Sequence, residues 1–220
     1  MNHMKLCLDA VIFDFDGTLA KLNIDFPRMQ KSLIELIERH GIVTHDMAHL
    51  FSLEMIEAGR IQIVENYPKR EPSYLREAHA LISELEMEGA RNGILMEGTR
   101  EMLQELKKRN IKTGIVTRNC QSAITHVFPD LFTYFDAVVT RENTPHVKPH
   151  PEHLRLALKK INTGAESASM IGDHPMDMKI GQDVGTITIG VLTGASDIHS
   201  LIQAKADIIL EKAVDLLNVI

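Results

Sequence analysis

Short apolar runs, each ending in a polar turn, recur along the chain and predict buried strands. The first is residues 6–13 (LCLDAVIF), and five later runs are also rich in Ile and Val: residues 111–116, 137–139, 169–172, 186–192 and 207–210. None of them alternates cleanly with polar residues, as a strand with one exposed face does. The pattern therefore predicts strands that are buried on both faces, which is typical of a parallel sheet.

Amphipathic helical patterns separate the later runs. Residues 98–110 place apolar side chains on one side and end in basic residues, which suit the C-terminus of a helix. Residues 151–161 begin with proline, which is favoured at the first helical position, and carry a similar apolar stripe. Strands that alternate with helices predict an α/β fold, with a Rossmann-like parallel sheet covered by helices.

Residues 20–92 interrupt this alternation, because only helical patterns occur there. Three helices are expected: residues 26–40, 44–58 and 73–88. Thr44 and Ser73 are the expected N-caps of the second and third helices. A block of helices between the first strand and the rest of the sheet indicates an inserted α-helical domain.

The domain boundaries follow from this reading. The Rossmann-like core would consist of residues 1–19 and 93–220, and the helical cap domain of residues 20–92. The hinges would lie at residues 17–25 and 89–98, since glycines cluster in the second of these segments.

The composition narrows the class of protein. The 220 residues are 44% hydrophobic, which suits a soluble protein with a sizeable core. With 24 Lys and Arg against 30 Asp and Glu, the formal charge of −6 argues against general nucleic-acid binding, which usually requires a basic face. A small phosphorylated metabolite remains a suitable partner, because its site needs only a few local cations.

The location and the assembly are less strongly constrained. The two cysteines, Cys7 and Cys120, have no metal or redox spacing, which fits a reducing compartment. The N-terminal residues lack the basic region and apolar run of a signal peptide. No apolar stretch approaches the ~20 residues that span a bilayer. We therefore expect a cytoplasmic protein with no membrane partner, and either a monomer or a homodimer.

Polar residues gather where the predicted strands end. In an open parallel sheet, ligands bind beyond the carboxyl ends of the strands, so these positions are the first candidates for a site. Three strand ends and one loop supply them: Asp14-Phe15-Asp16-Gly17-Thr18, Thr117-Arg118-Asn119, Lys148, and Asp173 with Asp177. We expect these groups to converge at one edge of the sheet, although they are far apart in the chain.

Phosphoryl transfer is the chemistry that suits these groups. Mg²⁺ takes oxygen ligands, and Asp14 and Asp173 would supply the carboxylates. With one oxygen on the metal, Asp14 keeps the other free to attack phosphorus and form an aspartyl-phosphate. Lys148 is the natural cation for the phosphate oxygens, and Thr117 offers them a neutral donor.

The turn after the first strand adds a second group of donors and an acid. Gly17 and Thr18 can present backbone N–H groups to an anion. A bend at Gly17 would turn Asp16 towards the leaving-group oxygen, where it would act as general acid and later as general base for water. A model Asp has a pKa of about 3.9, so the acid role requires surroundings that keep Asp16 protonated. The candidates for phosphate binding are Gly17, Thr18, Thr117, Arg118, Asn119 and Lys148.

Four motifs carry a resemblance to a known family and occur in that family's order: DFDGTL at 14–19, IVTRN at 115–119, VKPHPE at 147–152 and IGDHPMD at 171–177. Together they resemble the haloacid-dehalogenase superfamily of phosphatases across the whole predicted core. The helical insert is similar to that family's cap, and the segment ITIGVLTGA (187–195) resembles the phosphoglycolate-phosphatase-like members. Such a resemblance implies a Mg²⁺-dependent phosphatase.

The resemblance also implies a set of metal ligands. These are the side chains of Asp14 and Asp173 and the backbone carbonyl of Asp16, with Asp177 acting through water or as a support. The second Asp of DxD separates the chain from the dehalogenases of that superfamily, which lack it and need no metal. His174 departs from the family pattern, since small polar residues are common there, and it would lie near the metal-bound waters or the cap.

Two other clusters invite a functional reading. His146, His150 and His153 surround Lys148, but no further ligand has a zinc-site spacing, so we expect exposed loop histidines. Basic residues in the insert could bind an anionic tail of a substrate, although a solvated face is expected: Arg60, Lys69 and Arg70.

Alternatives to a small-molecule phosphatase stay open. A phosphosugar mutase of the same superfamily would return the phosphate to a sugar instead of to water. A non-catalytic regulatory homologue would keep the fold without turnover, which the intact acid set disfavours. Phosphoglycolate is the first guess for the substrate, while a nucleotide monophosphate, pyrophosphate and sugar phosphates compete with it. Caps of this kind close over the leaving group and set substrate specificity, but no residue pattern in the insert indicates which substrate it selects.

Overall fold

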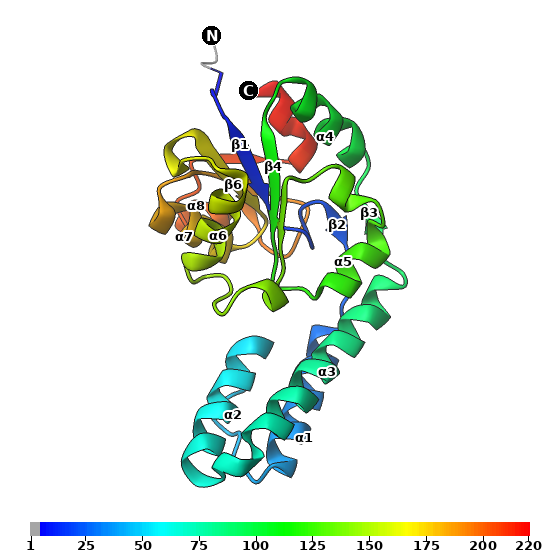
Figure 1. Cartoon of the computed structure of the whole chain (residues 1–220), viewed down its shortest axis with the longest axis vertical. Coiled ribbons are helices and arrows are strands. Elements are labelled where there is room, and N and C mark those ends of the chain that lie inside the picture. The colour runs from blue at the N-terminus through cyan, green and yellow to red at the C-terminus, as the bar shows by residue number, and fades with distance from the viewer. Residues whose placement is uncertain (1–4) are drawn as a thin grey trace. The chain divides into compact units, whose positions relative to one another are not determined.

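The computed structural model describes residues 5–220, and the chain forms two compact units (Figure 1). One unit consists of Met1–Leu22 and Gly93–Ile220, and the other of Asn23–Asn92. Each unit has its own hydrophobic core, because the buried apolar side chains form a cluster within the helical unit and another against the sheet.

The larger unit contains a six-stranded parallel sheet in the order β5-β4-β1-β6-β7-β8. Its strands are β1 Ala10–Phe13, β4 Lys112–Val116, β5 Ala137–Val139, β6 Ala168–Gly172, β7 Ile187–Val191 and β8 Ile208–Leu210. Counted along the chain, this is the 3-2-1-4-5-6 order of a doubly wound fold, in which ligands bind where the order reverses. The predicted Rossmann-like α/β fold is confirmed. The first strand is shorter than expected, because only residues 10–13 pair with both neighbours.

Helices cover the sheet on both faces, as Figure 1 shows. They are α4 Thr99–Lys108, α5 Gln121–Val127, α6 Glu152–Ile161, α7 Pro175–Val184 and α8 Ile198–Gln203. Because side chains alternate along a strand, Ile12 packs in the cluster with Leu154 of α6 and Ile180 of α7, while Phe13 points the other way. On that side Phe13 contacts Phe135 edge to face, with ring centroids 6.4 Å apart.

A small two-stranded antiparallel sheet lies next to the first motif and was not predicted. Its strands, β2 Ala20–Lys21 and β3 Ile94–Leu95, pair antiparallel, with Ala20 opposite Leu95 and Lys21 opposite Ile94. Two residues per strand are too few to produce an alternation in the sequence. This two-stranded sheet joins the two chain segments of the larger unit on either side of the insert.

The second unit is helical. It consists of α1 Phe26–Arg39, α2 Ser52–Asn66, a 3₁₀ turn Pro68–Arg70 and α3 Glu71–Ala90. The second helix begins eight residues later than residue 44, so its predicted start at Thr44 is wrong. Residues 44–50 form turns with bonds between residues three apart, from Met47 N–H to Thr44 O and from Leu50 N–H to Met47 O. The Thr44 hydroxyl donates to Glu38 Oε1 (2.7 Å) instead of capping a helix.

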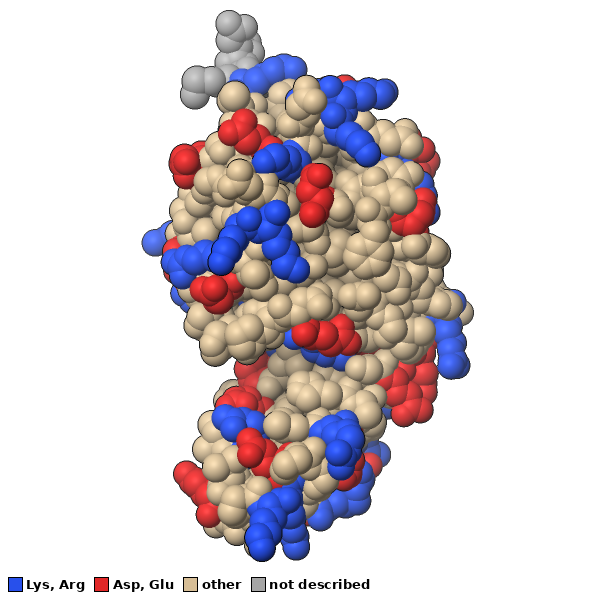
Figure 2. Space-filling view, in the orientation of Figure 1, with Lys and Arg blue, Asp and Glu red and all other residues tan. Residues whose placement is uncertain are grey.

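Charged side chains of both signs are mixed on the face shown in Figure 2. In the helical unit Arg60 pairs with Glu57 and with Glu71 (2.7 and 2.9 Å), while Lys69 and Arg70 are exposed. This arrangement agrees with the solvated face expected for these basic residues. Among residues 5–220 no helix combines the length and the apolar composition needed to cross a bilayer.

Candidate active site

Asp14 lies at the carboxyl end of β1, at the centre of the sheet. Its backbone N–H donates to Ile171 O of β6 (2.8 Å), which fixes the residue against the neighbouring strand. Two donors contact the same carboxylate oxygen, Oδ1: the backbone N–H of Phe15 at 2.7 Å and Lys148 Nζ at 2.8 Å. The Asp14 carboxylate is thus oriented by its own loop and by the lysine of the third motif.

Lys148 bridges Asp14 to Asp177. Its Nζ lies 2.7 Å from Asp177 Oδ1, and both side chains are buried. Burial alone would lower the pKa of Lys148, but Asp14 and Asp177 raise it above its usual value, so the ammonium stays charged. The other oxygen of Asp177 accepts the backbone N–H of His174 (3.1 Å) and thereby caps the N-terminus of α7.

Asp173 follows β6 and is held by two donors. The hydroxyl of Thr18 donates to Oδ1 (3.3 Å), and the backbone N–H of Ala195 donates to Oδ2 (2.8 Å). Two glycines make room for it: Gly17 has φ +81°, and a Cβ there would lie 2.6 Å from the carboxylate, while a Cβ on Gly194 would overlap it. The close packing holds the Asp173 carboxylate in one position.

The carboxylates of Asp14, Asp173 and Asp177 form a cluster that suits a divalent cation. Each offers an oxygen, and these oxygens all lie within 4.8 Å of one another. Burial and the Asp14 charge raise the pKa of Asp173 to about 6. Burial raises the pKa of Asp177 to about 7, with Asp14 and Asp173 adding to the rise and Lys148 opposing it. Three carboxylates beside one ammonium leave two negative charges uncompensated, and a bound Mg²⁺ would balance them.

The loop after β4 presents the second motif. Thr117 is fully buried, and its hydroxyl donates to Asn119 Oδ1 (2.9 Å) and accepts the Asn119 N–H (3.2 Å). Arg118 is half-buried and donates from Nη1 to Lys148 O (2.8 Å). The structure therefore joins this loop to the loop of Lys148, and phosphate binding by the three residues stays a prediction.

The turn of the first motif is closed by its own backbone. The Gly17 N–H donates to Ala20 O (2.8 Å) and the Thr18 N–H to Phe15 O (3.3 Å), so both amides bond within the loop. Asp16 is half-buried, and its Oδ1 accepts the backbone N–H of Leu22 (2.8 Å). Asp16, Gly17 and Thr18 lie beside the carboxylate cluster. The roles of Gly17 and Thr18 in phosphate binding and of Asp16 in proton transfer stay predictions.

His153 departs from the expectation for the loop histidines. His146 and His150 are exposed as predicted, and their rings stack with centroids 4.3 Å apart. His153 is fully buried, and both ring nitrogens have partners: Nδ1 accepts the Lys148 N–H (3.0 Å) and Nε2 bonds Val139 O (3.0 Å). The signal that could have found it is its place on the apolar side of the helix at residues 151–161, four positions before Ala157 and eight before Ile161.

The segment after β7 is a further part of the site that the sequence did not single out. Besides the Ala195 amide on Asp173, the Thr193 hydroxyl donates to Gly17 O (2.6 Å). These bonds tie the segment after β7 to the first motif through Gly17 and to the fourth motif through Asp173. The Gly-Ala pair in ITIGVLTGA was a usable signal, since a glycine at a strand end indicates a close approach of the backbone.

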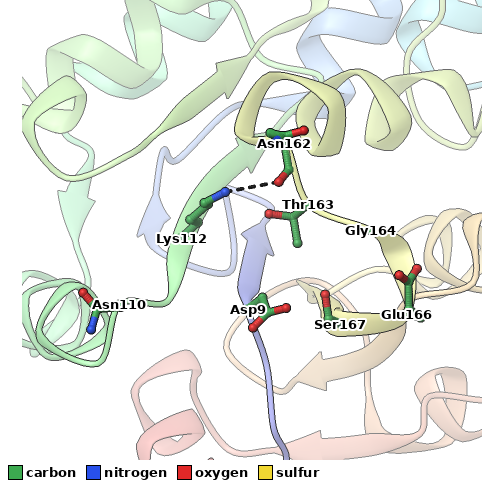
Figure 3. Close-up of a pocket in the computed structure, with 8 residues that line it drawn as sticks. All are labelled: Asp9, Asn110, Lys112, Asn162, Thr163, Gly164, Glu166 and Ser167. Atoms are coloured by element: carbon green, nitrogen blue, oxygen red, sulfur yellow. Dashed lines mark hydrogen bonds between the residues drawn. The ribbon is translucent and has the colours of Figure 1, made fainter.

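A shallow polar pocket lies at the opposite, amino-terminal edge of the sheet (Figure 3). Its lining residues are Asp9, Asn110, Lys112, Asn162, Thr163, Gly164, Glu166 and Ser167. Lys112 Nζ donates to Ile161 O (2.6 Å) and Asn162 O (3.2 Å), so it caps the C-terminus of α6. None of the predicted site residues lines this pocket, which agrees with ligand binding at the carboxyl ends of the strands.

Sequence comparison identifies relatives of this chain. A Bacillus cereus protein named pyrophosphatase PpaX is 39% identical over 126 residues, which are 56% of this chain and 58% of that relative. The PpaX of another Bacillus cereus strain is 30% identical over 227 residues, covering 97% of this chain and 96% of the relative.

Solved structures share the fold. A hydrolase from Pseudomonas syringae superposes with a TM-score of 0.70 at 25% identity and covers 96% of both chains. A putative β-phosphoglucomutase from Thermotoga maritima gives a TM-score of 0.61 at 26% identity, over 96% of this chain and 98% of the other. The haloacid dehalogenase-like hydrolase profile matches residues 11–191, from within β1 to the end of β7. The profile takes in all four motifs, and the chain belongs to the haloacid dehalogenase-like hydrolases.

Proposed function

We propose that the protein is a Mg²⁺-dependent phosphatase that hydrolyses a small phosphorylated metabolite through an aspartyl-phosphate on Asp14. The observation that carries this proposal is the cluster of Asp14, Asp173 and Asp177, whose oxygens lie within 4.8 Å of one another. Lys148 contacts two of the three carboxylates, at 2.7 and 2.8 Å. A divalent cation and a charged lysine beside a carboxylate are the components of phosphoryl transfer to an acidic side chain.

Asp14 is the proposed nucleophile. The Phe15 N–H and the Lys148 ammonium both contact Oδ1, which leaves Oδ2 as the oxygen that attacks phosphorus. Attack forms the bond between Oδ2 and phosphorus and breaks the bond from phosphorus to the leaving oxygen. Water then attacks the same phosphorus, restores the Asp14 carboxylate and releases inorganic phosphate.

Asp16 is the proposed general acid and base. It gives a proton to the leaving oxygen in the first step and takes one from the attacking water in the second. Its carboxylate is already held by the Leu22 N–H at 2.8 Å, so the side chain has a fixed direction before substrate arrives. A fixed direction lowers the cost of placing the proton donor in the transition state.

The remaining groups bind and neutralise the phosphate. Lys148 would bind a phosphate oxygen with its ammonium, and the Thr117 hydroxyl would donate to another. Asp14, Asp173 and the Asp16 carbonyl would hold the metal, with Asp177 as support. The metal supplies positive charge that stabilises the developing charge on the phosphate oxygens.

Two substrates lead the proposal. The resemblance to phosphoglycolate-phosphatase-like enzymes favours phosphoglycolate, and the name of the PpaX relatives favours pyrophosphate. We propose that the inserted unit, Asn23–Asn92, selects between leaving groups of this kind. A panel of small phosphate compounds, with phosphate release as the readout, would rank them by kcat/KM.

Two other functions compete with hydrolysis. The similarity to a putative β-phosphoglucomutase favours phosphate transfer between sugar positions, which would give an isomer without free phosphate. A non-catalytic regulator would bind Mg²⁺ and phosphate compounds without turnover. Measuring phosphate and sugar-phosphate isomers in the same reaction separates the three functions.

The decisive experiment replaces the nucleophile. Asp14→Asn should abolish phosphate release in the presence of Mg²⁺, and normal activity in that variant would contradict the proposal. Asp9→Asn is the matched control, since Asp9 is an exposed carboxylate just before the other end of β1. This control should keep both the turnover and the fold, as measured by circular dichroism.

A further inference from the structure

His153 is a buried histidine beside the site that no step of the proposed reaction uses. It lies in α6, and its Nδ1 accepts the backbone N–H of Lys148 at 3.0 Å. A nitrogen that accepts carries no proton, so the proton of the neutral ring is on Nε2 and is donated to Val139 O, also at 3.0 Å. Burial, together with the nearby Lys148 charge, lowers the pKa of His153 to about 3, so the ring stays neutral.

Val139 O connects this histidine to a second candidate residue. The same carbonyl accepts the backbone N–H of Thr117, at 3.1 Å. A chain of three hydrogen bonds therefore runs from Thr117 through Val139 O and the His153 ring to Lys148. It links the ends of β4 and β5 to the loop that carries the lysine.

The Lys148 peptide is also held on its other side. Arg118 Nη1 donates to Lys148 O at 2.8 Å, and Arg141 Nη1 donates to Arg118 O at 3.1 Å. The N–H and the C=O of one residue are thus both bound by side chains. The Lys148 side chain is buried and its ammonium lies between Asp14 and Asp177, so the stem has little room to compensate for a shift of the backbone.

We propose that His153 is a positioning residue that fixes the backbone of Lys148 relative to Thr117 through Val139 O. This inference rests on the proposed function, because there Lys148 and Thr117 bind oxygens of the same phosphate. The two donors must match the spacing of those oxygens in the transition state. A displacement of about 1 Å in such a group can lower the rate by about 100-fold.

Three substitutions separate the two hydrogen bonds of the ring. His153→Asn places an acceptor where Nδ1 lies and keeps the bond to Lys148. His153→Gln places its polar atoms near Nε2 and keeps the bond to Val139 O, while His153→Leu keeps neither. We expect kcat for p-nitrophenyl phosphate with Mg²⁺ to fall by about 10-fold to 100-fold in the Leu and Gln variants, and by less in the Asn variant. KM should change far less than kcat, because the loss lies in the transition state.

Amide hydrogen exchange tests the hydrogen bond from the Lys148 N–H to His153 without requiring turnover. The Lys148 amide should be protected in the wild type and in His153→Asn, and should exchange faster in His153→Gln and His153→Leu. His150→Asn is the matched control, since this exposed histidine accepts only a local N–H, from Glu152 at 3.2 Å. It should leave both kcat and the protection of Lys148 unchanged. Melting temperatures identify variants that lose the fold.

The outcomes distinguish this inference from the proposed function. If no phosphate compound is turned over, the proposed function fails, while exchange at the Lys148 amide still decides whether His153 holds it. Equal protection of that amide in the Asn and Gln variants would overturn the inference. Equal kcat in folded wild-type and His153→Leu protein would overturn it as well, even if Asp14→Asn abolishes activity.

Discussion

Lys148 and Asp177 form a buried ion pair, with Nζ 2.7 Å from Oδ1 and neither side chain more than 3% exposed. Lys148 also contacts Asp14 at 2.8 Å, so one ammonium compensates two carboxylates. Removing one partner of a buried pair leaves an unpaired charge, which usually costs about 3–5 kcal/mol. The lysine is therefore expected to matter for folding as well as for phosphate binding.

Lys148→Met should lower the free energy of unfolding by about 3–5 kcal/mol at pH 8 without metal. The loss should be smaller at pH 5.5, because Asp177, with a pKa of about 7, takes up a proton there and no longer needs the cation. Urea unfolding at both pH values measures the two losses. Lys112→Met is the control, since Lys112 donates to Ile161 O and Asn162 O, and its effect should not depend on pH. Equal losses at both pH values in Lys148→Met would contradict the prediction.

Mg²⁺ should raise the melting temperature, and the rise should be larger at pH 8 than at pH 5. The pKa values of Asp173 and Asp177, about 6 and about 7, lie above the ordinary aspartate value of 3.8. The folded state thus binds more protons than the unfolded state between about pH 4 and pH 7, and the metal-free protein loses stability as the pH rises through this range. A cation binds the ionised carboxylates and opposes that loss.

At a Mg²⁺ concentration about 100 times the dissociation constant, binding to the folded state alone adds about 2.7 kcal/mol. Scanning calorimetry with and without Mg²⁺ at both pH values tests this. Asp173→Asn should remove most of the rise and Asp9→Asn none of it. A rise that is equal at the two pH values would show that the ion binds elsewhere.

The sequence predicted the part of the site that depends on strand ends. Asp14, Lys148 and Asp173 lie where the strand pattern placed them, because parallel strands bring their carboxyl ends to one edge. His153 was not placed by the same reasoning, because it lies in α6 and not at a strand end. The helical period could have shown that it is buried, but its hydrogen bonds to the preceding loop and to β5 follow from the tertiary structure and leave no pattern in the sequence.

In the fold, too, elements with a local sequence pattern could be predicted, and elements set by tertiary contacts could not. The doubly wound sheet follows from apolar runs of Ile and Val without polar alternation, which are separated by amphipathic helical patterns. The start of α2 at Ser52 and the pairing of Ala20 with Leu95 could not be predicted from such patterns. Turns and two-residue strands depend on tertiary contacts. The N-cap of α2 is Phe51, which makes no side-chain cap bond. The start of this helix therefore has no polar capping residue that could be recognised in the sequence.

Ser169→Ala should stabilise the protein or leave its stability unchanged. Ser169 is fully buried in β6, and its hydroxyl has no hydrogen-bond partner in the described part of the chain. A buried polar group without a partner costs about 1–3 kcal/mol, and alanine removes it without adding volume. Thr113→Val is the contrasting variant, because the buried Thr113 hydroxyl donates to Tyr134 O (2.7 Å), and it should lower stability by about 1 kcal/mol. Urea unfolding compares the two, and a clear loss in Ser169→Ala would show a partner for the hydroxyl in solution.

Gly59 and Tyr74 make a test of packing inside the helical unit. Gly59 stands within α2, where alanine usually stabilises a helix by about 1 kcal/mol. Tyr74 of α3 occupies the space, since a Cβ on Gly59 would overlap its hydroxyl oxygen and lie 3.0 Å from Cζ. The same hydroxyl donates to Ile56 O at 2.9 Å, so it cannot move away without losing that bond.

Gly59→Ala should therefore lower the free energy of unfolding, because overpacking costs about 1–3 kcal/mol and outweighs the gain in helix propensity. In a Tyr74→Phe background the hydroxyl oxygen is gone, so the same substitution should cost less. Urea unfolding of the four proteins, monitored by the helical circular dichroism signal, gives a double-mutant cycle. The cycle yields the interaction free energy between positions 59 and 74. If Gly59→Ala stabilises the protein equally in both backgrounds, helix propensity decides the outcome and the close contact between α2 and α3 does not exist in solution.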